Sequence, residues 1–304
     1  NLLLNELTNL NGSVTTTNDL TVLSNLTGNT SSVNYYLVVG GDLRASASFQ
    51  LGTSYGYGHL IMTGSGKSLV AGSSNMALKS LTINSGASVT AYNSIDIFAT
   101  TTVVGTLNAA TSSFVFYGEG ASGLSVSGTF NPNTSTITFN SSDQVIPSST
   151  YYNLTIGLSA SGSSTLLASV TTTNLNVIGS AATFDLQTNS LVVTGNLINT
   201  NGRIIQTSGS VTLSSSSAAI SSPSSTQVYN LIITGTTTVY GGVTSTNVLT
   251  VNASAVLNAA SSTINLLGTG TPFVINGTFN YNTSTVVYSG ATANIASTTY
   301  YNLT

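Results

Sequence analysis

The chain has 304 residues, yet only 4% of them are charged and the net charge is −3. An ordinary globular protein carries about 25% charged residues. Ser and Thr make up about a third of the chain, and Cys is absent, which excludes disulfides and thiolate metal sites. A mean hydropathy of +0.31 with so little net charge excludes a disordered chain.

Two further classes of protein are excluded by the distribution of residues. The longest unbroken apolar run is Tyr35 to Val39, far below the roughly 18 residues of a membrane span. The basic residues Arg44, Lys67, Lys79 and Arg203 are scattered, whereas duplex DNA binding needs clustered phosphate contacts. We therefore expect no membrane span and no nucleic-acid partner. A polar but uncharged surface favours an extracellular or cell-surface location.

Short apolar cores separated by Gly, Ser, Asn and Thr recur along the chain and predict β-strands. Their β-branched and aromatic residues alternate with period two, and no stretch shows a capped helical period. In the first half, the cores centre on Leu2, Leu20, Leu37, Leu60, Leu81, Ile95, Phe114, Ile137 and Leu154. In the second half, they continue at Leu175, Leu191, Val211, Leu231, Leu249, Ile264, Val286 and Leu303, with a mean spacing of about 19 residues.

The chain also contains a tandem duplication of roughly 150 residues. The block "GTFNPNTSTITF" (Gly128 to Phe139) recurs as "GTFNYNTSTVVY" (Gly277 to Tyr288). Likewise "TLNAATSS" recurs as "VLNAASST", and "LVVGGDL" (Leu37 to Leu43) recurs as "LVVTGNL" (Leu191 to Leu197). We therefore predict two repeat units, 1–152 and 153–304, each of about eight coils in one continuous stack.

The two ends of the chain carry the same phrase. "SSTYYNLT" occurs at residues 148 to 155, and the chain closes on "STTYYNLT" and opens on "NLLL". We expect the ends to be cuts in a longer array, or docking faces between subunits, that open and close at the same point of the repeat. Within the phrase, Tyr151 and Tyr152 must face opposite sides of a strand.

Two all-β architectures fit this pattern: tandem antiparallel sandwiches, or a parallel β-solenoid with one coil per repeat of about 19 residues. The solenoid is favoured because it stacks like residues over like, so that repeated charges would repel one another. Thr, Ser and Asn stack without that cost, and stacked Asn side chains form hydrogen-bonded ladders. Asn153, Asn174, Asn230 and Asn302, each before a core Leu, are candidates for such a ladder.

The sequence offers little that resembles a catalytic site. His59 is the only histidine, and a Ser-His-Asp triad through it is weakly indicated. Asp42 and Arg44 are predicted to form a surface salt bridge rather than part of a site. The remaining carboxylates show no grouping, and no calcium loop, phosphate loop or dinucleotide motif is present, so no metal and no cofactor are expected. The acidic residues outside Asp42 are Glu6, Asp19, Asp96, Glu119, Asp143 and Asp185.

N-glycosylation is chemically available at Asn-X-Ser/Thr sequons, at about the number expected by chance. Asn133 with Asn282, and Asn153 with Asn302, are paired across the duplication and are the strongest candidates. The remaining sequons are at Asn11, Asn25, Asn29, Asn140, Asn252 and Asn276. The Thr runs are too irregular along the chain to predict an ice-binding array.

The coil length, the composition and the phrase "TYYNLTI" resemble the right-handed β-helical, Ser/Thr/Asn-rich arrays of prokaryotic cell surfaces, such as adhesins of the filamentous-haemagglutinin type. The resemblance implies a structural or adhesive role outside the cell. Our first hypothesis is a structural, non-catalytic segment of an extracellular filament that assembles with itself, end to end or laterally, with covalent glycans available at its sequons. The alternative is a carbohydrate- or surface-binding adhesin module, with Tyr35, Tyr55, Tyr57 and Tyr92 as exposed stacking platforms. A polysaccharide-active enzyme is the third and least favoured reading.

Overall fold

The structure, a computed structural model, describes residues 1–28, 34–51, 57–118, 123–157, 162–179, 182–222 and 226–304. These residues form parallel β-strands and no helix, which confirms the predicted β-solenoid. The coils average about 21 residues and number about 13. Contacts divide the chain into two compact units, Asn1–Pro147 and Ser148–Thr304.

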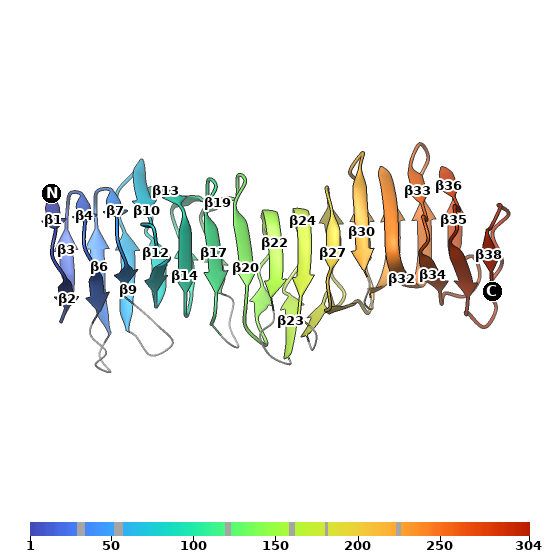
Figure 1. Ribbon diagram of the computed structural model, residues 1–304, viewed down its shortest axis with the longest axis horizontal. Coiled ribbons are helices and arrows are strands. Elements are labelled where there is room, and N and C mark those ends of the chain that lie inside the picture. Colours follow the sequence, from blue (N-terminus) through green and yellow to red (C-terminus); the bar gives the residue numbers. More distant parts are fainter. Residues whose placement is uncertain (29–33, 52–56, 119–122, 158–161, 180–181, 223–225) are drawn as a thin grey trace. The chain divides into compact units, whose positions relative to one another are not determined.

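Each coil of the first unit contributes one strand to each of three parallel sheets, here called faces, and the coils stack side by side (Figure 1). Face 1 contains β1 (Leu2–Leu4), β4 (Leu20–Val22), β7 (Leu43–Ala45), β10 (Lys67–Val70), β13 (Ser88–Tyr92), β16 (Thr106–Asn108) and β19 (Thr129–Asn131). Face 2 contains β2 (Thr8–Leu10), β5 (Leu26–Gly28), β8 (Phe49–Gln50), β11 (Met76–Leu78), β14 (Ser94–Ile97), β17 (Ser113–Phe116) and β20 (Thr136–Phe139). Face 3 contains β3 (Val14–Thr16), β6 (Tyr35–Val39), β9 (Gly58–Met62), β12 (Ser80–Ile83), β15 (Thr101–Val103) and β18 (Leu124–Val126), and β21 (Val145–Ile146) follows.

The second unit is also a parallel stack, but two of its described strands, β24 (Val170–Ile178) and β32 (Thr236–Val251), pair with two or more strands of a neighbouring coil. The longest, β32, pairs in succession with β33 (Val256–Asn258), β34 (Thr263–Leu266) and β35 (Phe273–Ile275) of the next coil. The other strands are β22 (Thr150–Gly157), β23 (Gly162–Leu166), β24 (Val170–Ile178), β25 (Ala182–Asp185), β26 (Leu191–Val193), β27 (Leu197–Asn199), β28 (Arg203–Ile205), β29 (Ser210–Leu213), β30 (Ala218–Ser222) and β31 (Gln227–Ile233). They continue with β33 (Val256–Asn258), β34 (Thr263–Leu266), β35 (Phe273–Ile275), β36 (Thr278–Asn280), β37 (Thr285–Tyr288) and β38 (Asn302–Leu303).

The true coil is longer than the spacing of the sequence cores suggests. On face 1, Leu20 pairs with Leu43 and Leu43 with Leu69, which gives coils of 23 and 26 residues. The sequence cores step from Leu20 on face 1 to Leu37 on face 3, so that this step covers only part of a coil. Counting cores from different faces as if each began a new coil lowers the apparent coil length from about 21 residues to about 19.

Alternation along each strand places one set of side chains inside every coil and the other outside. In β17, Phe114 and Phe116 are buried while Val115 points outward. Phe116 stacks on Phe139 of the next coil with ring centroids 5.3 Å apart. As predicted, Tyr151 is buried and Tyr152 is not. The inner columns of Leu, Val, Ile and Phe therefore form the core of each unit.

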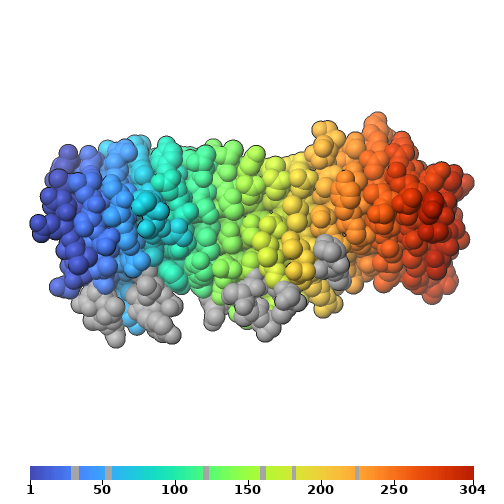
Figure 2. All heavy atoms as spheres, in the orientation of Figure 1, coloured from blue at the N-terminus to red at the C-terminus, as the bar shows by residue number. Residues whose placement is uncertain are grey.

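The duplication extends to backbone detail. Asn133 and Asn282, which are equivalent in the two units, both adopt positive φ, at 48° and 44°. Ala110 and Ala260 are likewise paired, at 45° and 48°. Because a non-glycine residue rarely adopts positive φ, this agreement shows that the same turns are conserved in both copies. On the face seen in Figure 2, the described atoms of successive coils abut within each unit and leave no deep hollow.

Truncation of the core phenylalanine in Phe116→Ala is expected to destabilise the first unit by about 3 to 5 kcal/mol, because it leaves a cavity in the stacked column. The matched control is Val115→Ala on the same strand, whose side chain points outward and whose loss costs about 0.5 kcal/mol. Urea unfolding followed by far-UV circular dichroism measures both. Equal losses in the two variants would contradict the alternation described for β17.

Candidate functional site

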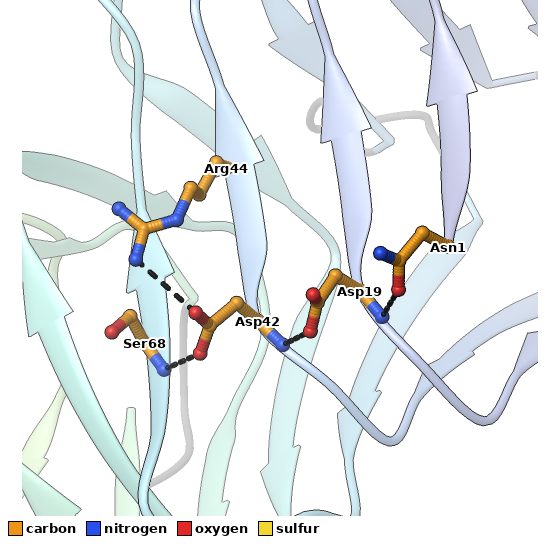
Figure 3. A network of polar contacts seen from close by, with 5 residues as sticks. All are labelled: Asn1, Asp19, Asp42, Arg44 and Ser68. Carbon is orange, nitrogen blue, oxygen red and sulfur yellow. Dashed lines mark hydrogen bonds and ion pairs between the residues drawn. The ribbon is translucent and has the colours of Figure 1, made fainter.

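The most continuous polar feature of the first unit is a column of side chains that each stand just before, or at the start of, a face-1 strand (Figure 3). We call Asn1, Asp19 and Asp42 the Asx column, which ends at the backbone N–H of Ser68. The Oδ1 atom of Asn1 accepts the backbone N–H of Asp19 at 3.4 Å, and Asp19 Oδ1 accepts that of Asp42 at 2.9 Å. Asp42 Oδ1 in turn accepts the N–H of Ser68 at 2.8 Å. Each carboxylate thus satisfies a backbone donor of the following coil.

The second unit repeats this column with amides in place of the carboxylates. Asn174 donates from Nδ2 to Asn153 Oδ1 at 2.9 Å, and its own Oδ1 accepts the backbone N–H of Asn196 at 3.1 Å. Asn196 Oδ1 accepts the N–H of Ala219 at 3.0 Å. The predicted Asn ladder is therefore confirmed for Asn153 and Asn174. Asn230 belongs to a different pair, in which it accepts from Asn247 at 2.8 Å.

A glycine precedes the acceptor in both columns, and the structure shows why. A Cβ atom at Gly41 would lie 2.4 Å from Asp19 Oδ1, and one at Gly195 would lie 2.7 Å from Asn174 Oδ1. Because both the backbone and the Asx side chain of one coil lie over the glycine of the next, only glycine leaves the room that they need. The duplicated blocks "LVVGGDL" and "LVVTGNL" therefore each contain the glycine and the Asx residue that form one step of the column.

Asp42 also forms the predicted surface salt bridge, with Arg44 Nη2 donating to Oδ2 at 3.1 Å. The backbone N–H of Ser68 and then the Arg44 guanidinium hold the pKa of the Asp42 carboxyl below its usual value. Since the pair is solvent-exposed, we assign it little stability of its own. The carboxylate acts mainly as an acceptor within the column.

The sequons differ in how far their amides are committed to the fold. Asn11, Asn133, Asn276 and Asn282 are exposed, and the positive φ of Asn133 and Asn282 places them on tight turns. The Asn133 amide donates a long hydrogen bond of 3.4 Å to the Asn131 carbonyl. Asn25 and Asn302 are also exposed, but their amides form hydrogen bonds. Asn25 Oδ1 accepts the Ser48 N–H at 3.3 Å, and Asn302 Nδ2 donates to Thr285 Oγ1 at 3.3 Å.

Three other sequons are half-buried. Asn140 forms a hydrogen bond with the Tyr117 hydroxyl, and Asn153 accepts one from Asn174 in the second-unit column. Asn252 is half-buried to a similar extent. Asn29 lies outside the described residues. Accessibility thus favours Asn133 and Asn282 over Asn153, and glycosylation itself stays a prediction.

The tyrosines do not form the exposed platform that the sequence suggested. Tyr35 is buried, and its hydroxyl donates to the Leu51 carbonyl at 2.5 Å; burial raises its pKa. The prediction for Tyr35 is therefore wrong: Gly28 and Gly58 leave the space into which its ring packs. Tyr57 is half-buried and Tyr92 is 40% exposed. Tyr55 lies outside the described residues.

His59 does have a serine partner. His59 Nδ1 lies 2.6 Å from Ser80 Oγ, and the two residues pair in register between β9 and β12. On the other side, Tyr36 of β6 stacks on the imidazole, with ring centroids 5.0 Å apart and planes 24° from parallel. His59 and Ser80 are 21 residues apart, about one coil, and this separation is the feature of the sequence from which their pairing could be predicted.

The carboxylates do not gather into a site in the part of the chain that the structure describes. There, no group of three His, Cys, Asp or Glu side chains is placed to hold a metal ion. Glu119 lies outside that part. The described ranges also hold no helix of the length and apolarity needed to cross a membrane.

Comparison with known proteins gives no relative from which a function could be transferred. No protein-family model, no curated protein and no solved structure matches the chain.

The Asx column makes the first unit sensitive to acid. Because the pKa of Asp42 is lowered on folding, its carboxylate contributes stability that is complete above the unfolded pKa and is lost as pH falls through the folded pKa. We expect Asp42→Asn to flatten the acid limb of the stability profile, since an amide oxygen still accepts the Ser68 N–H. Asp42→Leu should cost about 1 to 2 kcal/mol at neutral pH, because that N–H loses its partner.

Urea unfolding at pH values from acid to neutral measures these effects. Glu6→Gln, which removes an exposed carboxylate outside the column, is the control. An Asp42→Asn variant as acid-sensitive as the parent would exclude this role for the carboxylate.

Proposed function

We propose that the chain is a structural, non-catalytic segment of an extracellular filament or cell-surface fibre. The observation that carries the proposal is the unbroken stacking within each unit, where inner apolar columns and outer polar columns repeat from coil to coil. Such a stack is quasi-one-dimensional, because each coil contacts only its neighbours. Length can then be added without changing the local structure, which is what a fibre requires.

The composition supports the same proposal. Strands stacked about 4.8 Å apart bring equivalent side chains together, so a charged column would repel itself. A chain with 4% charged residues avoids this repulsion. The partners we propose are further copies of the chain and covalent glycans on its exposed sequons, in an extracellular or cell-surface location.

A carbohydrate-binding adhesin module is the second candidate. Its support is the exposed rings of Tyr36 and Tyr92, which are 42% and 40% exposed. The stacking of Tyr36 on His59 weighs against it, because the ring face that would meet a sugar on that side is already covered.

The test is immunogold electron microscopy of intact, unpermeabilised source cells with an antibody against this chain, together with imaging of material sheared from them. We expect gold particles along extracellular filaments, and filaments in the sheared fraction. Labelling confined to the cell interior, or sheared material consisting of discrete particles, would contradict the proposal.

A further inference from the structure

We propose that Ser80 is an activated nucleophile, with His59 as its general base, and that it accepts an acyl group from an activated ester or thioester. This inference adds a covalent attachment site to the proposed structural role and does not depend on it. It rests on the contact between the chain's one histidine and one of its many serines.

The geometry of the pair is that of a nucleophile and its base. Ser80 Oγ and His59 Nδ1 are 2.6 Å apart, within the range over which a base removes a proton. Both residues are half-buried and point outward from face 3, so that a small acyl donor can approach the hydroxyl. The stacked Tyr36 ring restrains the imidazole on the side away from Ser80. The base is therefore oriented before any reagent arrives.

The charge state of His59 suits the role. Burial, and then the positive charge of Lys79, lower the pKa of its imidazole, which favours the neutral ring. With the ring proton on Nε2, which is buried and bonds no described residue, Nδ1 can accept the proton of Ser80. The groups that face His59 are Tyr36 of β6, Ser80 of β12, and Lys79, the residue just before β12.

The proposed step balances without an oxidant or cofactor. Ser80 Oγ forms a bond to the acyl carbon while its proton passes to His59 Nδ1. The bond between the acyl carbon and the leaving oxygen or sulfur breaks, and the leaving group takes the proton from His59 or leaves as an anion. The product is an O-acyl serine and a free alcohol or thiol.

The experiment uses the full chain with two probes, a fluorophosphonate and p-nitrophenyl acetate, and locates the adducts by peptide mass spectrometry. The fluorophosphonate reports Ser80 Oγ through a new O–P bond with loss of fluoride. We expect one adduct per chain, on Ser80, and no adduct there in Ser80→Ala.

His59→Phe keeps a ring for Tyr36 to stack on but removes the base, and we expect it to slow labelling about a hundredfold. Ser113→Ala is the control, since Ser113 points outward on face 2 with Ser94 and Thr136 as its register neighbours. It should label as the parent does. Circular dichroism confirms that each variant keeps its strands.

The pH profile separates a base from a merely structural histidine. The labelling rate should rise with pH through a midpoint below the ordinary histidine pKa, and this rise should disappear in His59→Phe. Adducts spread over many serines, or a folded His59→Phe variant that labels Ser80 at the parental rate, would overturn the proposal.

Discussion

The structure depends on one constraint, the in-register stacking of parallel strands from coil to coil. Because neighbouring strands lie about 4.8 Å apart, each side chain has the equivalent residue of the next coil as its nearest neighbour. Apolar residues then form continuous inner columns, and outer positions must hold residues that tolerate their own repetition. Hydroxyls, amides and β-branched side chains meet that condition. Charged side chains repel one another when repeated, and the stacked Asp19 and Asp42 are held by backbone N–H donors and by Arg44. The composition of the chain follows from this repetition.

The Asx column shows how the stacking is maintained where a backbone N–H group bonds a side-chain oxygen of the preceding coil. An oxygen on one coil accepts a backbone N–H of the next, in one unit through Asp19 and Asp42 and in the other through Asn174 and Asn196. Carboxylate and amide oxygens are equivalent acceptors here, but only the carboxylates titrate. The second unit thus keeps the same bonds without charge, and the first compensates its charge at Asp42 with Arg44.

Much of this architecture could be predicted because it depends on residues that are close together in the sequence. Period-two alternation gave the strands, the repeated blocks gave the duplication, and Asn before a core Leu gave the ladder at Asn153 and Asn174. The spacing of the cores underestimates the coil length, because a core on one face and a core on the next look alike in sequence. The burial of Tyr35 depends on Gly28 and Gly58, two glycines on neighbouring coils, and so requires the register. The contact between His59 and Ser80 depends on the same register.

Register is therefore the central claim, and the absence of cysteine from the chain allows it to be tested by engineered disulfides. Val115 and Thr138 are outward-facing register partners on β17 and β20, whereas Thr136 lies two residues away along β20. Cysteines at 115 and 138 should oxidise to an intramolecular disulfide under native conditions, because a disulfide needs Cα atoms within about 7 Å. Cysteines at 115 and 136 should stay reduced. Equal oxidation of both pairs, or oxidation of the second pair alone, would contradict the in-register solenoid.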